Sequence, residues 1–171
     1  MLKPALGVAR KWSVHVPKDS IQLSLEGSMN EEPSSQIGNL EIVQDHYDAL
    51  NRGDIPVALQ SFAPDVVSVE PDHFPHGGET RGLEAVTKLF VQGRSSWAEG
   101  GCMPQKLIPA GHRVVAFCQV HVRLNGQTTW IDGQVTDVIT FQDGSIIHRR
   151  TFEDPQQAIV YAGLTTEDAG S

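Results

Sequence analysis

The amino-acid sequence predicts an α+β fold in which helices come first and an antiparallel sheet follows. From residue 40 to 62 and again from 83 to 92, apolar residues recur every three or four positions, which is the spacing of amphipathic helices. From residue 113 onward apolar and polar residues alternate, and two turn signals, Asn125-Gly126 and Asp143-Gly144, separate the alternating runs. Helices and a sheet of this kind pack as two layers, and we expect a cavity between them.

Composition narrows the classes of protein to consider. The chain has 171 residues, the size of one domain, and its net charge of -8 argues against a nucleic-acid partner. It has no run of about 18 apolar residues, so we expect no membrane span. Its two cysteines, Cys102 and Cys118, are too few for a disulfide framework and lack zinc spacing. We therefore expect a cytoplasmic protein with reduced thiols and no bound metal or other cofactor.

The start of the helical spacing marks the start of the predicted domain. Residues 1–38 contain three prolines and two short alternating runs, so we treat them as an N-terminal extension that forms a hairpin or stays loosely ordered. We place the domain at residues 39–164 and a polar tail at residues 165–171.

Capping residues define the predicted helices. Asn39 suits the N-cap of the first helix, Gly53 ends it, and Asp54 can cap the second. A third helix follows Gly82. The predicted elements of this half are helices over residues 40–50, 54–62 and 83–92, a strand over residues 66–70 and a loop over residues 72–81.

The second half of the chain is predicted to be a meander. Its elements are strands over residues 113–124, 128–141 and 146–152 and a helix over residues 156–164. A tight turn at Asn125-Gly126 pairs Leu124 with Gln127, His121 with Trp130 and Cys118 with Gly133. This register places Asp137 on the apolar face of the sheet.

Asp137 is unusual because a carboxylate on an apolar face is costly to bury without a partner. A two-residue turn at Asp143-Gly144 would place Arg150 opposite Asp137, and a three-residue turn with a glycine bulge would place Arg149 there. Either register predicts an arginine across from the acid. The pair is then a structural ion pair or part of a functional site.

Four segments in a fixed order carry a family resemblance. They are Tyr47-Asp-Ala-Leu-Asn-Arg-Gly-Asp54, Phe62-Ala-Pro-Asp-Val-Val67, Gly82 before a helix, and Phe141-Gln-Asp-Gly-Ser-Ile146. Over residues 39–164 the chain resembles the SnoaL-like branch of the nuclear-transport-factor-2-like superfamily. The resemblance implies a cone, with a curved antiparallel sheet wrapped on N-terminal helices around an apolar pocket. The superfamily includes ketosteroid isomerases, polyketide cyclases and non-catalytic binding domains, so the fold does not settle the function.

The resemblance implies roles for particular residues. Glu70, followed by Pro71, resembles the proton-shuttling carboxylate of ketosteroid isomerases, and Asp137 resembles their protonated aspartic acid. His46 resembles the position of their oxyanion tyrosine, with Tyr47 as the alternative inward residue. Those isomerases use one ionised carboxylate as base and keep another neutral as a hydrogen-bond donor. An arginine beside Asp137 would favour its ionised form and oppose that role.

These observations predict a function in outline. We expect a cofactor-independent acid-base enzyme that abstracts a proton next to the carbonyl of an apolar small molecule, as an isomerase or polyketide cyclase does. The alternative is a non-catalytic small-molecule-binding or assembly domain of the same fold. The expected substrate-binding residues are Tyr47, Trp97, Cys118, Val120, Val122, Arg149 and Thr151.

The outer face of the predicted sheet carries Trp130, Val138 and His121. Its apolar content exceeds what a solvated surface needs. We therefore expect a homodimer formed through this face.

Overall fold

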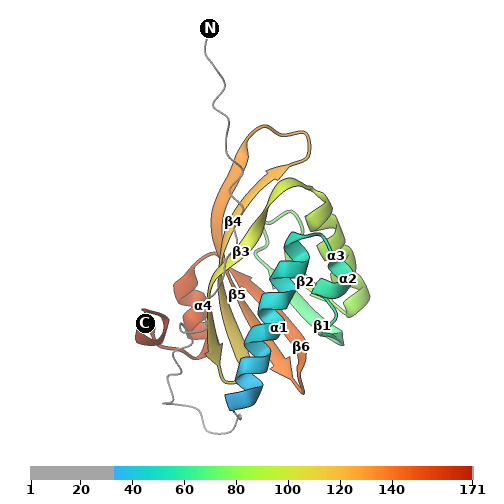
Figure 1. Ribbon diagram of the computed structural model, residues 1–171. Coiled ribbons are helices and arrows are strands. Elements are labelled where there is room, and N and C mark those ends of the chain that lie inside the picture. The colour runs from blue at the N-terminus through green and yellow to red at the C-terminus, as the bar shows by residue number, and fades with distance from the viewer. Residues whose placement is uncertain (1–32, 171) are drawn as a thin grey trace.

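A computed structural model of the chain describes residues 33–170 (Figure 1). The two alternating runs before residue 26 lie outside the described residues. The described residues form a six-stranded sheet with helices on both of its faces. This arrangement confirms the predicted α+β class. No described helix is long and apolar enough to cross a membrane.

The first helix, α1 (Pro33–Asn51), begins earlier than predicted. Proline suits the first turn of a helix, and Asn39, the expected N-cap, is instead buried within it. The second helix, α2 (Ile55–Ala58), is a single turn capped by Asp54, which accepts a hydrogen bond from Val57 N at 3.3 Å. The predicted extension of α2 to residue 62 is wrong.

The sheet has the order β2-β1-β6-β5-β4-β3, and the β1–β6 pair is parallel while the other pairs are antiparallel. Its strands are β1 (Phe62–Glu70), β2 (Gly78–Arg81), β3 (Trp97–Ala110), β4 (Arg113–Leu124), β5 (Trp130–Gln142) and β6 (Ser145–Phe152). Sequence reasoning missed β2 and β3. In β3 the prolines Pro104 and Pro109 hide the strand pattern, and they are tolerated because β3 is an edge strand with an irregularity after Pro104.

The β4–β5 pairing differs from the predicted register by two residues. His121 pairs with Asp132 and Cys118 with Val135, so the predicted register is wrong. The turn at Asn125-Gly126 does form, because Gln127 N donates to Leu124 O at 3.1 Å, but β5 begins only at Trp130 and residues 125–129 form a longer loop. Tertiary contacts hold this loop, because Asn125 donates to Ser96 O at 2.9 Å and Ser95 O at 2.7 Å. A shift of two residues preserves the facing of every side chain, so Asp137 still lies on the buried face.

The β5–β6 turn has two residues, Asp143 and Gly144, both with positive φ. An irregularity then follows between Thr140 and Phe141, and it changes the register beyond the turn. Thr151 therefore lies opposite Asp137. Both predicted registers, with Arg150 or Arg149 directly opposite the acid, are wrong.

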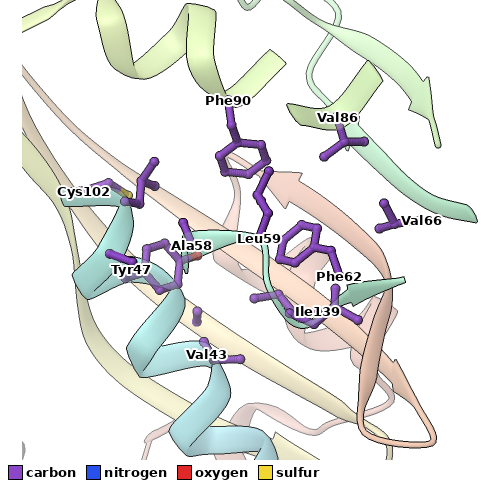
Figure 2. Packing of buried hydrophobic residues seen from close by; sticks show 14 of the residues in the cluster. Val43, Tyr47, Ala58, Leu59, Phe62, Val66, Val86, Phe90, Cys102 and Ile139 are labelled. Carbon is purple, nitrogen blue, oxygen red and sulfur yellow. The ribbon is translucent and has the colours of Figure 1, made fainter. Parts of the chain in front are cut away.

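Two apolar clusters lie on opposite faces of the sheet. On the inner face, α1, α2 and α3 (Leu83–Ser95) pack Tyr47, Ala58 and Phe90 against the strands (Figure 2). On the outer face, α4 (Pro155–Ala162) covers Val138, which is fully buried. Val138 therefore does not belong to a free outer surface, contrary to the prediction.

The C-terminal residues are more ordered than expected. Helix α4 starts at Pro155, with Asp154 as its N-cap, and Gly163 ends it in the left-handed conformation. Residues of the predicted tail form the short helix α5 (Thr166–Gly170).

Candidate functional site

Asp137 lies at the centre of a buried hydrogen-bond network on the inner face of the sheet. The side chain of Asp137 is 1% exposed, and its Oδ2 accepts a 2.5 Å hydrogen bond from the Tyr47 hydroxyl. Its Oδ1 accepts a hydrogen bond of the same length from Thr151 Oγ1, which the β5–β6 register places directly opposite. Arg149 Nε donates to Oδ2 at 3.2 Å. Each of these groups donates, so Asp137 is an acceptor in all three contacts.

Arg149 links Asp137 to Glu70. Its Nη1 donates to Glu70 Oε1 at 3.0 Å and to Ser68 Oγ at 3.3 Å, and its Cζ lies 5.3 Å from the centre of the Phe90 ring. The parallel β1–β6 pairing brings Ser68 beside Arg149. The arginine therefore contacts Asp137 from a diagonal position in the sheet.

Exposure rises from one end of this network to the other. The side chain of Arg149 is 11% exposed and that of Glu70 is 19% exposed, against 1% for Asp137. Glu70 lies at the end of β1, where the strand leaves the sheet. The predicted candidates Glu70, Asp137, Arg149, Tyr47 and Thr151 thus converge, and Glu70 and Arg149 form the accessible end.

Burial and the neighbouring charges shift the pKa values of Arg149 and Tyr47 in this network. Burial lowers the pKa of Arg149, but the carboxylates of Asp137 and Glu70 outweigh it and hold that pKa above its ordinary value. Burial, followed by the charge of Asp137, raises the pKa of Tyr47 well above 10, so the phenol keeps its proton. Arg149 remains a cation and Tyr47 a donor at neutral pH.

His46 lies beside the network but does not join it. Its Nδ1 lies 2.7 Å from Ala58 O, so this nitrogen carries the proton and donates. The ring packs against Tyr47, Phe62 and Phe90. Burial lowers the pKa of His46 to about 4, although the hydrogen bond to Ala58 opposes the shift. The structure thus places a neutral histidine in the aromatic core, with Tyr47 as the residue that reaches Asp137.

The depressed pKa of His46 predicts a pH-dependent stability. Between pH 6.5 and pH 4 the unfolded chain binds a proton at His46 that the folded protein does not, so stability is present above pH 6.5 and is lost as the pH falls. We expect lowering the pH from 7.5 to 5 to reduce the free energy of unfolding by about 2 kcal/mol through this residue. Urea unfolding of His46→Gln should show a pH dependence weaker by that amount. The exposed His121→Gln is the matched control, and equal pH dependence in all three proteins would contradict the assignment.

Further predicted pocket residues lie on the same inner face, on β3 and β4. Val122 and Cys118 are buried, while Val120 and Trp97 are partly buried against the inner cluster. Sequence reasoning missed Ile131, which pairs with Val122 and is 47% exposed. Its parity with Asp137 along β5 could have identified it.

The two cysteines are neighbours inside the cone. Both are buried, and contact with the Cys102 thiol, followed by burial, raises the pKa of Cys118. A thiol that keeps its proton is a poor nucleophile. Cys118 therefore contributes to the lining of the inner face.

Two hollows of the described residues lie away from the network. One of about 60 Å³ lies between α1 and α2 and includes His46 and Ala58, and a groove of about 230 Å³ crosses the outer face beside Phe117 and Glu153. Neither is lined by Glu70, Asp137 or Tyr47. Large side chains fill the interior of the cone next to the network.

No group of three or more potential metal ligands occurs within residues 33–170. His73 instead contacts Glu153 at 3.1 Å in an exposed pair. The expectation that the protein works without a metal remains a prediction.

Comparisons with known proteins place this geometry in a family. Residues 43–149 match the model of the SnoaL-like domain, and no curated protein matches the chain. The fold is similar to that of an NTF2-like protein of unknown function from Burkholderia pseudomallei, with 25% identity, a TM-score of 0.62 and coverage of 72% of this chain and 95% of that chain.

Two further solved structures share the fold. TerC, co-crystallised with polyporic acid, has 21% identity and a TM-score of 0.61, with coverage of 74% of this chain and 98% of that chain. A hypothetical protein with a ketosteroid isomerase-like fold from Catenulispora acidiphila, in complex with trimethylamine, has 16% identity and a TM-score of 0.59, with coverage of 74% and 95%. At these identities the likeness shows the fold alone. The match over residues 43–149 shows more, and this chain belongs to the SnoaL-like domain family.

Proposed function

We propose that this protein is an acid-base enzyme that abstracts a proton next to the carbonyl of an apolar small molecule, leading to isomerisation or ring closure. In this proposal Glu70 accepts the proton and Arg149 stabilises the enolate oxygen. Proton transfer of this kind uses side chains alone and needs no cofactor. The observation that carries the proposal is the 3.0 Å contact between Glu70 and Arg149 at the accessible end of the network.

The contact suggests how the reaction could proceed. The substrate carbonyl oxygen accepts a hydrogen bond from Arg149, and the C–H proton passes to Glu70. The neutral acid then holds Arg149 less strongly, so the guanidinium can pair with the enolate that has just formed. One carboxylate is consumed as one enolate appears, so the total charge of the site is unchanged and little reorganisation of its surroundings is required.

Asp137 has a positioning role in this scheme. It accepts hydrogen bonds from Tyr47, Thr151 and Arg149, so its contacts do not match those of a neutral donor aimed at substrate. Its negative charge anchors the Nε edge of Arg149 and leaves the Nη1 edge directed to Glu70. Val120, Ile131 and Trp97, on the same inner face, are available for the apolar part of a substrate.

A direct test uses deuterium incorporation from D₂O, followed by NMR, with a panel of β,γ-unsaturated ketones and β-keto methyl esters as probes. We expect the wild-type protein to accelerate exchange at the carbon next to the carbonyl of at least one probe. Arg149→Lys keeps the charge but loses the forked contacts, and it should reduce the rate roughly 10²–10³-fold. Arg150→Lys, on the outer face, is the matched control and should not affect the rate. Exchange no faster than in buffer for every probe would contradict the proposal.

A second candidate is a ligand-capture domain without catalysis. It is favoured by hollows that lie away from Glu70 and Asp137, because a ligand held there would not reach the proposed base. Binding of a panel probe without deuterium exchange, detected as chemical-shift changes in Val120 and Ile131, would support this candidate over the enzyme.

We also retain the proposal of a homodimer through the outer face, now limited to the part that α4 leaves uncovered. Trp130 is 38% exposed there and stacks on His121 with ring centres 4.2 Å apart. Trp130→Glu should dissociate the dimer, because it places a charge in the proposed apolar contact. Light scattering at micromolar concentration should report a dimer for the wild type, and a wild-type monomer would rule out this interface.

A further inference from the structure

Two guanidinium groups flank one aromatic ring on the outer face of the sheet. The Cζ atoms of Arg113 and Arg150 each lie 5.2 Å from the centre of the Tyr161 ring on α4. Arg113 Nη1 also donates to Tyr161 O at 3.0 Å, and Arg150 lies 5.2 Å from the Phe152 ring. These contacts hold both cations in place before any ligand binds.

The sheet register brings two more polar side chains to the same place. Thr140 pairs with Arg113 on one side and with His148 on the other, and Arg150 lies two residues beyond His148 on the same face. Adjacent strands are about 4.8 Å apart, so Arg113 and His148 lie on the two sides of Thr140, one strand away in each direction. We call Arg113, Thr140, His148 and Arg150 the outer cation cluster.

The charge of the cluster is not balanced by its neighbours. Within residues 33–170, neither Arg113 nor Arg150 has a carboxylate within ion-pair distance. The nearby acid Glu79 is already paired with Arg81. Most charged side chains of this chain are acidic, and its net charge is -8. Arg113 and Arg150 are therefore two neighbouring cations whose charge no described acid offsets at ion-pair distance.

The pKa of His148 reflects the positive charge around it, and one of its ring nitrogens has no hydrogen-bond partner among the described residues. Burial lowers its pKa, and Arg150, Arg113 and Arg81 lower it further against the opposing effect of Glu79. The Nδ1 atom of His148 and the Nε atom of Arg113 are both buried without a hydrogen-bond partner among the described residues. The cluster is thus positive and not fully satisfied by the surrounding side chains.

We propose that the outer cation cluster binds a small oxyanion, either free phosphate or the phosphate or carboxylate group of a metabolite. Arg113 and Arg150 supply the charge and forked donors that suit an oxyanion, and the Thr140 hydroxyl supplies a further donor. The exposed side chain of Arg150 gives access from solvent. This site lies on the face of the sheet opposite Glu70 and Asp137, so it does not depend on the proposed function.

The test adds millimolar sodium phosphate, sodium acetate or sodium chloride at constant ionic strength to the full-length protein. Two readouts are followed, the melting temperature and the NMR titration of His148. We expect phosphate to raise the melting temperature by a few degrees relative to chloride, because it binds only the folded chain. It should also raise the pKa of His148, because a bound anion offsets the field of the arginines. Acetate distinguishes the sources, since an effect equal to that of phosphate indicates a carboxylate-bearing ligand.

Two variants test whether phosphate binds at the outer cation cluster. Arg150→Gln should weaken phosphate binding roughly tenfold, since it removes a charge-assisted hydrogen bond. Arg52→Gln removes the same charge from an exposed position in the turn after α1 and should bind phosphate as the wild type does. The proposal is overturned if phosphate and chloride act equally on both readouts. It is also overturned if Arg150→Gln retains the wild-type response, because the anion then binds elsewhere.

Discussion

Replacing Asp137 by leucine is expected to lower the free energy of unfolding by about 3–5 kcal/mol, because it removes the acceptor of three buried donors. The hydroxyls of Tyr47 and Thr151 would lose their partner, and Arg149 would keep only Glu70 as a counterion. Asp137→Asn keeps the shape and one acceptor oxygen, so we expect a smaller loss of stability. Guanidinium-induced unfolding measures both variants.

Asp132→Asn is the matched control, since the Asp132 side chain is 62% exposed and its partner is the exposed His121 on β4. It should change the stability by no more than about 0.5 kcal/mol. A leucine variant as stable as the wild type would show that the Asp137 carboxylate is not the anchor of the network.

Glu70→Gln is expected to reduce the rate of probe exchange by about 10³-fold, or about 4 kcal/mol in barrier, while probe affinity stays similar. Glutamine keeps an oxygen that can accept from Arg149, so the fold should be retained, but it cannot take the proton. The deuterium-exchange assay and a melting curve on the same sample separate lost chemistry from lost folding. Glu79→Gln, on the neighbouring strand β2, is the control and should leave the rate unchanged. Full exchange in Glu70→Gln would end the role of Glu70 as the base.

The buried position of Asp137 was predictable because side-chain facing depends on parity alone. The predicted β4–β5 register was wrong by two residues, yet every residue kept its face. The same parity correctly placed Cys118, Val120 and Val122 on the inner face. Parity does not predict which residues form hydrogen bonds with Asp137.

The prediction of the residue opposite Asp137 was wrong because the β5–β6 register shifts by one residue beyond the turn. The turn itself was readable, since Asp143-Gly144 suits two positive φ angles. The irregularity arises beyond the turn, where β6 also pairs with β1 and Ile146 N donates to Ser61 O at 2.8 Å. Pairing with a strand about 80 residues earlier in the chain is not encoded in the local sequence.

By itself, the sequence determined the α+β class, the family resemblance and the inward facing of Asp137, since each follows from local spacing, turn residues and short motifs. Tertiary structure alone decided that Tyr47, Thr151 and Arg149 are the partners of Asp137. It also decided that α4 covers Val138 and that arginines gather around Tyr161. The physical reason is that these contacts join segments far apart in the chain, and their geometry is fixed only when the sheet closes on its helices.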